Sequence, residues 1–195
     1  MKTLLYIDCC IRDEASRTQQ LAQSFLNNVS ETYEVTTLKL TKLDLKPLIG
    51  EHFEEREQLL TAKNYHHPRF DLAHQLVAAD AIVIAAPFWD LSFPALLKLY
   101  IEACAVDQIT FKSTPDGLIG MCNAKHLVYL TTRGGVYTDS PSEQALPYLR
   151  HISTFFGVDH FHAISADGMD IQGYDSKLSL QNAKSEAEAL AKTLF

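Results

Sequence analysis

The sequence predicts an α/β fold, in which helices cover both faces of a five-stranded parallel sheet and one domain spans residues 1–195. Two observations predict it. Strand-like and helix-like segments alternate five times along the chain, which is typical of a parallel sheet with crossover helices. The run Ala81–Ala86 is apolar and rich in β-branched residues, as expected of a strand that is buried on both faces.

Around this central strand, the first half of the chain alternates strands and helices. The expected elements are, in order, a strand over 3–9, a helix from Ser16 to about Val29, a strand over 35–40, a charged helix over 51–63 and a short helix over 70–79. Leu21, Phe25 and Val29 recur at spacings of four, which is typical of an amphipathic helix. The charged helix has only a thin apolar stripe, so we expect it to be a surface insertion.

In the second half, proline and glycine mark the expected helix boundaries. The expected elements are a helix from Pro94 to about Val106, a long loop over 108–125, a strand over 126–132, a helix over 140–156, a strand over 159–166 and a helix over 176–194. Pro94 and Pro141 lie in first turns, where proline is favoured, and Gly157 follows a last turn. Five strands in this length match the flavodoxin-like three-layer sandwich, with strand order 2-1-3-4-5.

Composition limits the class of protein. The 195 residues are 47% hydrophobic and 21% charged, and no apolar run is long enough to cross a bilayer. A net charge of −7 without a cluster of lysine and arginine argues against a nucleic-acid partner. The chain enters its first strand without an apolar leader, and its four cysteines lack zinc or CxxC spacing, so we expect reduced thiols in a cytoplasmic protein. The histidines show no metal-ligand spacing, and no metal is expected.

The end of the first strand carries the features of a phosphate site. Cys9 begins a short turn, and Ser16 is a good cap for the helix that follows. Arg17 and Thr18 lie in the first turn of that helix. A helix N-terminus with free amides, hydroxyl groups and an arginine is suited to bind a phosphate. An ordinary helix start would also use such a cap, so this feature alone leaves both interpretations open.

An aromatic turn follows the central strand. Pro87 ends that strand, because proline cannot donate to the ladder of hydrogen bonds. Phe88, Trp89, Asp90 and Leu91 come next, at a position where open parallel sheets bind their ligands. We expect Trp89 to line a pocket for a flat ligand; the alternative is that Phe88 and Trp89 cover the core.

Two glycines follow the fourth strand, in the segment Thr132-Arg133-Gly134-Gly135. Paired glycines let backbone amides approach a ligand closely, although they also suit a plain turn. The predicted strand order places the ends of the first, third and fourth strands side by side. A phosphate site, an aromatic turn and a glycine turn at one edge would together suit a phosphorylated flat ring system, and the candidate is FMN.

At these positions the sequence resembles the FMN-dependent NADH-azoreductases and quinone reductases, whose motifs follow in the same order over most of the chain. The family motifs Ser-x-Ser, Pro-x-Tyr-Asn-Phe, Leu-Lys-x-Tyr, Thr-Phe-Lys/Arg and Ser-Arg-Gly-Gly correspond to Ser16–Thr18, Pro87–Leu91, Leu97–Tyr100, Thr110–Lys112 and Thr132–Gly135. The sequence departs from the family pattern at Cys9, Cys10, Trp89, Asp90 and Tyr137, the last lying near the position of a common family histidine. The carboxylate of Asp90 would lower the flavin reduction potential unless a donor such as Arg133 met its charge.

The resemblance implies an enzyme that uses FMN and either NADH or NADPH to reduce quinones or azo compounds, by ping-pong hydride transfer through the flavin N5. It implies that the backbone amides of Trp89, Asp90, Gly134 and Gly135 contact the ring edge. Tyr137 is a candidate proton donor or ring neighbour. The resemblance also implies a homodimer.

Two alternative functions share part of this pattern. A flavodoxin-type electron carrier would bind FMN without turning over a substrate of its own, but the long loop 108–125 and the insertion 51–63 favour an enzyme with a built-up pocket. Low-molecular-weight phosphatases need a Cys-x5-Arg loop after the first strand. Here six residues separate Cys10 from Arg17, which is one too many for that loop.

Overall fold

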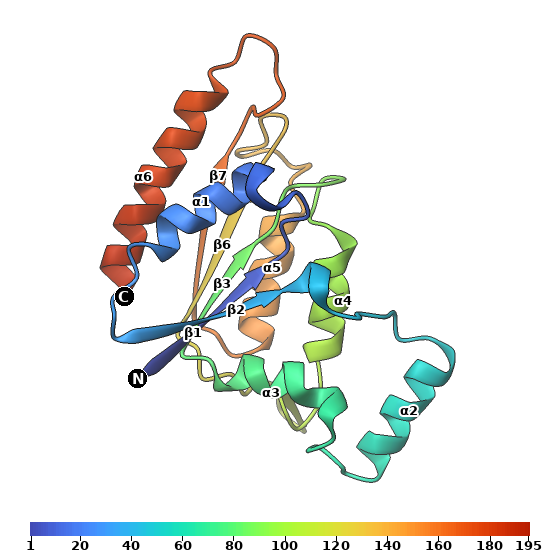
Figure 1. Cartoon of the computed structure of the whole chain (residues 1–195). Coiled ribbons are helices and arrows are strands. Elements are labelled where there is room, and N and C mark those ends of the chain that lie inside the picture. Colours follow the sequence, from blue (N-terminus) through green and yellow to red (C-terminus); the bar gives the residue numbers. More distant parts are fainter.

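A computed structural model describes residues 1–195, apart from the side chain of Glu14. Its centre is a five-stranded parallel sheet in the order β2-β1-β3-β6-β7 (Figure 1), which confirms the predicted order with the strands renumbered. The strands are β1 (Lys2–Asp8), β2 (Tyr33–Lys39), β3 (Ala81–Ala85), β6 (His126–Thr132) and β7 (His160–Ala166). All carboxyl ends therefore meet at one edge, which we call the carboxyl edge, and all amino ends at the opposite edge.

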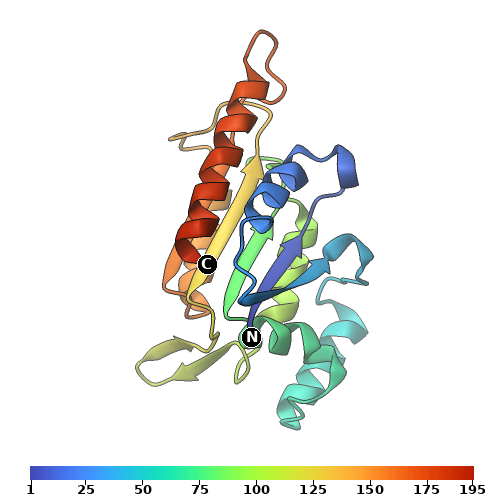
Figure 2. The same ribbon diagram turned by 60° about the vertical axis from the view of Figure 1, so that its left-hand side comes forward.

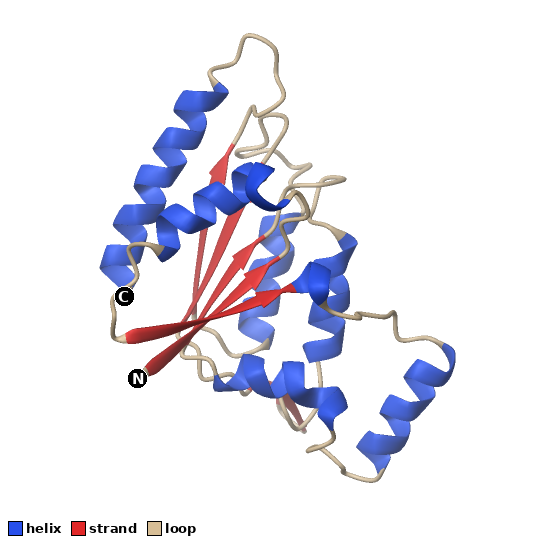
Figure 3. Ribbon diagram, viewed as in Figure 1, coloured by secondary structure: helices blue, strands red, loops and turns tan.

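Helices cover both faces of this sheet, as Figure 3 shows. One face is covered by α1 (Arg17–Leu26) and α6 (Ser176–Leu194), and the other by α3 (Asp71–Ala78), α4 (Ala95–Cys104) and α5 (Ala145–Phe155). The central strand β3 divides its side chains between them: Ile82 and Ile84 join the α3–α5 side, and Val83 joins the α1–α6 side. A strand buried on both sides needs apolar residues at every position, which explains the absence of alternation in its sequence.

The charged helix α2 (Gly50–Thr61) projects away from the sheet in Figure 1, so the prediction of a surface insertion is confirmed. Three short 3-10 helices, η1 (Asp13–Ala15), η2 (Leu40–Lys42) and η3 (Pro68–Phe70), lie in connections. No helix within the described part of the chain is long and apolar enough to span a membrane.

The expected loop 108–125 is wrong in part, because it contains an antiparallel hairpin, β4 (Phe111–Thr114) with β5 (Gly117–Gly120). Figure 2 shows it projecting from the body beyond the amino edge. Its base packs closely on the end of α5. A Cβ atom on Gly120 would lie 2.0 Å from the backbone nitrogen of Gly157, so this contact requires glycine. The signal was present as a Pro-Asp-Gly turn, but strands of four residues that are largely exposed give little periodicity.

The helix expected from Ser140 begins five residues later, at Ala145. Two sets of hydrogen bonds hold the intervening residues outside the helix. The amide of Gln144 donates to the Leu91 carbonyl at 2.9 Å, and the Glu143 carboxylate accepts hydrogen bonds from the amides of Ala145 and Leu146. Glu143 thus satisfies amides that would otherwise need a cap, and the prediction that Pro141 opens the helix is wrong.

Candidate functional site

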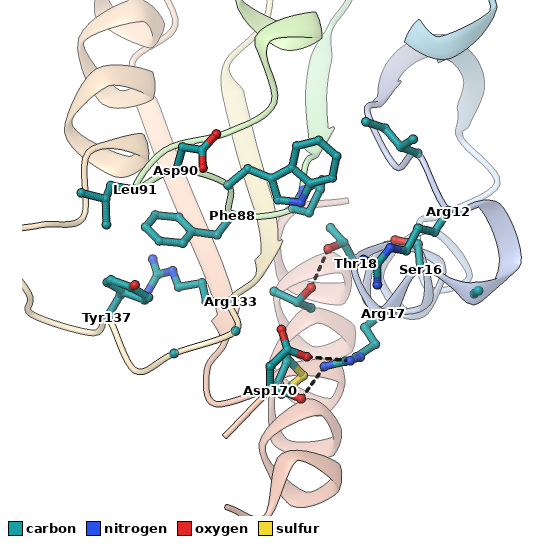
Figure 4. A pocket seen from close by; sticks show the side chains of 18 residues that line it. Arg12, Ser16, Arg17, Thr18, Phe88, Asp90, Leu91, Arg133, Tyr137 and Asp170 are labelled. Carbon is teal, nitrogen blue, oxygen red and sulfur yellow. Dashed lines mark hydrogen bonds and ion pairs between the residues drawn. The ribbon is translucent and has the colours of Figure 1, made fainter. Parts of the chain in front are cut away.

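A cavity of about 410 Å³ opens at the carboxyl edge, above the ends of β1, β3, β6 and β7 (Figure 4). Its lining comes from four separate loops and the start of α1. The lining residues are Ile11, Arg12, Ala15, Ser16, Arg17, Thr18, Pro87, Phe88, Trp89, Asp90, Leu91, Thr132, Arg133, Gly134, Gly135, Tyr137, Met169 and Asp170. The phosphate site, aromatic turn and glycine turn expected from the sequence are thus brought together.

The start of α1 forms one wall. The Ser16 side chain caps the helix by accepting from the Gln19 amide at 3.3 Å. The amides of Arg17 and Thr18 belong to the first turn and have no acceptor within the helix. Thr18 is buried and shares a hydrogen bond of 2.7 Å with the hydroxyl of Thr132, which ties this wall to the end of β6. The wall therefore presents backbone donors to the cavity from a fixed position.

Arg17 crosses the cavity floor to the loop after β7. Its Nη1 donates to the Met169 carbonyl at 2.6 Å, and its Nη2 lies 3.0 Å from Asp170 Oδ1. Arg17 retains 39% side-chain exposure, so its guanidinium is still accessible from the cavity. Arg12 lines the same end and is exposed. Two arginines and a helix N-terminus make this end of the cavity favourable for an anion.

The aromatic turn is a tight two-residue turn. The backbones of Trp89 and Ser92 exchange hydrogen bonds of 3.0 and 2.8 Å, while Asp90 and Leu91 both have positive φ, at 48° and 65°. Aspartate tolerates this conformation better than most residues, whereas leucine is strained there, and strain of this kind is concentrated at binding sites. Trp89 is 42% exposed and lines the cavity, so it lies outside the core as predicted.

Arg133 lies beneath the aromatic turn and is only 1% exposed. Its Nη1 donates to Asp167 Oδ1 at 3.3 Å, its Nη2 lies 3.7 Å from Glu143 Oε1, and its guanidinium faces the Phe88 ring at 5.5 Å. The suggested pairing of Arg133 with Asp90 is therefore wrong, because two buried carboxylates already neutralise the guanidinium. Arg133 pairs with these two carboxylates and not with Asp90, because a buried charge requires partners at close range.

The glycine turn brings its backbone against the cavity. A Cβ atom on Gly134 would lie 2.7 Å from Asp170 Oδ2, and one on Gly135 would lie 2.9 Å from the ring of Tyr137. Tyr137 in turn packs on Phe88, with ring centroids 4.6 Å apart. The two glycines thus keep the backbone accessible between a carboxylate and an aromatic pair.

Comparisons with known proteins agree with this geometry. The family described as "Flavodoxin-like fold" matches residues 2–191. An FMN-dependent NADH:quinone oxidoreductase 2 of Clostridium perfringens (strain 13 / Type A) is 36% identical over 200 positions, covering 98% of this chain and 99% of that protein. The chain belongs to this family of FMN-dependent NADH:quinone oxidoreductases. A second relative in the family, from Caldicellulosiruptor saccharolyticus, is 37% identical over 98% of this chain and 99% of its own length.

A solved structure shares the architecture of this FMN-dependent NADH:quinone oxidoreductase family. The crystal structure of an azoreductase from Bacillus anthracis str. Sterne has a TM-score of 0.86 and 26% sequence identity, and the match covers 100% of both chains. The match over the whole length of both chains shows that the two proteins share one fold.

The cavity also includes residues that the sequence reasoning missed, namely Ile11, Arg12, Ala15, Met169 and Asp170. The segment after β7 could have been found, because the fifth strand of this family's sheet lies beside the fourth. Cys9, by contrast, was predicted as a cofactor contact, yet it is fully buried in the core and is not among the lining residues. Burial and the nearby Asp8 raise the pKa of the Cys9 thiol to about 12, so it stays protonated.

Three histidines gather at the amino edge, far from the cavity. His126 Nδ1 and His162 Nε2 are 3.2 Å apart, and the rings of His126 and His160 stack at 5.1 Å. His160 and His162 lie on one face at the start of β7, and His126 is their neighbour on the paired strand β6. Among the described residues, no group of three His, Cys, Asp or Glu side chains is arranged to hold a metal ion.

Proposed function

We propose that this chain is an FMN-dependent enzyme that oxidises NADH and reduces quinones, with azo compounds as alternative acceptors. The observation that carries the proposal is the cavity, which gathers an anion-binding helix start, an aromatic turn and a glycine turn at the carboxyl edge. The names of relatives at 36% and 37% identity over the whole chain support the same activity. The same assay with NADPH in place of NADH measures the preference between the two donors.

The residues present fit FMN. The cavity volume of about 410 Å³ lies within the range of roughly 300–1,000 Å³ that is usual for small-molecule sites. Only glycine at positions 134 and 135 lets the side chains of Asp170 and Tyr137 lie against the loop backbone that lines the cavity. Cationic groups lie at one end and aromatic rings at the other, which matches a phosphate joined to a flat ring.

In this proposal the chain binds and orients the cofactor. The amides at the start of α1, with Ser16, Arg17 and Thr18, hold the phosphate. The turn Pro87–Leu91 forms the wall for the ring, and the loop Thr132–Gly135 offers backbone donors to its polar edge. FMN when bound would supply the hydride chemistry that links NADH to the acceptor.

Tyr137 is placed to act on the acceptor. Its ring packs on Phe88 and its half-buried side chain lines the cavity, so the phenol remains in contact with solvent. In the proposal its Oη donates a proton to a reduced acceptor, and its ring limits the width of the cavity.

Two measurements test the proposal. The purified protein should bind FMN with visible absorption bands near about 375 and 450 nm, which belong to the cofactor. It should then oxidise NADH in the presence of menadione at steady state. Failure to bind FMN contradicts the proposal, whereas FMN binding without turnover of NADH and menadione favours the flavodoxin-type electron carrier.

We also propose a homodimer located in the cytoplasm. Exposed apolar side chains surround the mouth of the cavity, including Trp89, Leu91 and Val136, and a second copy would cover them. The four cysteines are free thiols, which suits a reducing compartment. Light scattering at micromolar concentration should show twice the mass of the chain, and a monomer alone would contradict the dimer.

A further inference from the structure

The loop 133–138 is bound along its length to the segment 166–170 that follows β7. The carbonyls of Arg133, Gly134 and Gly135 accept hydrogen bonds of 2.9–3.0 Å from the amides of Met169, Asp170 and Gly168, respectively. The amide of Arg133 donates in turn to the Ala166 carbonyl at 2.9 Å. Three consecutive carbonyls of the loop are therefore directed toward the neighbouring segment.

This arrangement fixes the direction of the loop amides. Among the described residues, the amides of Gly134 and Gly135 have no acceptor, and both residues line the cavity. An amide that faces a cavity and has no acceptor in the protein can donate to a ligand without breaking a hydrogen bond within the protein. The segment 166–170 thus acts as a template that leaves two donors available to a ligand.

Asp167 is the centre of this template, although it does not line the cavity. Its Oδ2 accepts from the amides of Tyr137 and Thr138, both at 2.9 Å, and from the Thr138 hydroxyl at 2.8 Å. Its Oδ1 accepts from Arg133 at 3.3 Å. One carboxylate, 7% exposed, therefore holds both ends of the loop that carries the two glycines.

We propose that Asp167 is a positioning residue for the flavin ring, acting through the loop 133–138. The inference rests on the proposed function and concerns how the ring edge is recognised. A rigid support behind a binding loop improves affinity because the loop is already ordered before the ligand arrives. Asp167 does this from behind, by satisfying the loop amides at 137 and 138 and the Arg133 guanidinium while leaving the glycine amides free.

Asp167→Asn is a sharp test, because an amide cannot replace both functions of the carboxylate. If its oxygen faces the amides of Tyr137 and Thr138, its NH₂ group faces the Arg133 guanidinium, and two donors oppose each other. If it turns round, the loop amides lose their acceptor. Arg133 keeps Glu143 as a counter-ion in either case.

The experiment compares binding of FMN and of riboflavin, which lacks the phosphate, to the flavin-free full-length protein. We expect Asp167→Asn to weaken both ligands by the same factor of about ten, since the loss lies at the ring edge. Arg17→Ala should weaken FMN by a much larger factor than riboflavin, because only FMN loses a phosphate contact. In nuclear magnetic resonance spectra, the amides of Tyr137 and Thr138, which donate to Asp167 in the wild type, should exchange faster with solvent in the Asp167→Asn protein. A loss of global stability alone would spread faster exchange over all strands.

Two further variants guard against a simple folding defect. Thr138→Val removes one hydrogen bond to the same carboxylate at an exposed position, and it should weaken both flavins two- to threefold. Ser179→Ala is the matched control. The Ser179 hydroxyl donates to the backbone carbonyl of Asp167 at 2.9 Å and does not contact the loop 133–138, so flavin affinity should be unchanged.

The outcomes separate this inference from the proposed function. A wild-type protein that binds neither flavin contradicts the proposed function itself. The positioning role alone is overturned if the wild type binds FMN and the folded Asp167→Asn and Thr138→Val variants bind both flavins as tightly as the wild type does. A loss confined to FMN would also overturn it, because the effect would then lie at the phosphate.

Discussion

Both edges of the sheet carry titratable side chains, but only the carboxyl edge combines them with a cavity and with backbone amides that have no acceptor in the described part of the chain. At the amino edge, the histidines of β6 and β7 pack on one another, and a hydrogen bond joins His126 to His162. At the carboxyl edge, Arg133 pairs with two buried carboxylates in the loops after the same strands, while two glycine amides have no acceptor among the described residues. Titratable groups alone therefore do not indicate a binding site. Backbone donors without a protein acceptor, next to a cavity, do indicate one.

The largest expected effect is at the phosphate end of the carboxyl edge. Arg17→Ala removes a charge-assisted contact, which typically contributes about 1.5–3 kcal/mol, so FMN binding should weaken by roughly ten- to a hundredfold. A fluorescence titration with FMN measures it. His162→Gln at the amino edge serves as the control and should leave the FMN dissociation constant unchanged. An Arg17→Ala protein with wild-type affinity would mean that Arg17 serves only the contact with Asp170.

A smaller effect is expected from the aromatic pair. Tyr137→Ala removes the ring that packs on Phe88, and a ring contact of about 0.5–1.5 kcal/mol corresponds to a loss of FMN affinity of roughly two- to tenfold. Tyr137→Phe keeps the ring and should preserve affinity while it lowers kcat with quinone acceptors. Equal kcat values for Tyr137→Phe and the wild type would exclude the phenol as a proton donor.

At the amino edge we expect a response to pH in stability and none in binding. Burial, and after it the neighbouring imidazoles, lower the pKa values of His126 and His162 below their usual value of 6.5. The unfolded chain therefore binds more protons than the folded one just below that pH. The free energy of unfolding should accordingly be greatest above about pH 6.5 and decrease as the pH falls toward 5.

Urea unfolding of the wild type, of His162→Gln and of a control, His151→Gln, checks this expectation. His151 lies on α5, away from the three histidines, and its variant should follow the wild-type pH dependence. His162→Gln should lose part of the decrease at acidic pH. Identical curves for all three proteins would show that the amino edge is not linked to protons.

The smallest effect is expected at Asp90. Because Arg133 is paired elsewhere, the Asp90 carboxylate is not neutralised by it and would disfavour a more negative flavin. Asp90→Asn should therefore raise the reduction potential of bound FMN, and screening of this exposed group limits the rise to less than about 30 mV. Potentiometry on both proteins measures it. Equal potentials would leave Asp90 with only its role in the turn.

Local patterns made much of this predictable. The apolar run Ala81–Ala86 identifies the central strand, and the order of strands and helices then places three strand ends at one edge. Pro87 ends the strand because it cannot donate a backbone hydrogen bond, and the paired glycines 134 and 135 indicate a turn; both can be inferred from residue type. The aromatic turn and the glycine turn are accordingly predictable from the sequence.

What could not be predicted depends on contacts between distant segments. The sequence predicts Arg133 as a ligand contact. Only the positions of Glu143 and Asp167 show that it is a buried cation paired with carboxylates. The start of α5 is displaced by the hydrogen bond from Gln144 to Leu91, which joins two segments about fifty residues apart. Pairing of this kind leaves no periodic signal in either segment.

The contact between Gly120 and Gly157 bears on how the chain could be engineered. The tip of the hairpin, at Pro115 and Asp116, is exposed, whereas its base meets the end of α5 backbone to backbone. A peptide tag inserted at the tip should be tolerated, and the tip lies on the side of the molecule away from the cavity. Any side chain at residue 120 would lift the hairpin off its support, so an insertion library should recover variants across the tip and none at its base.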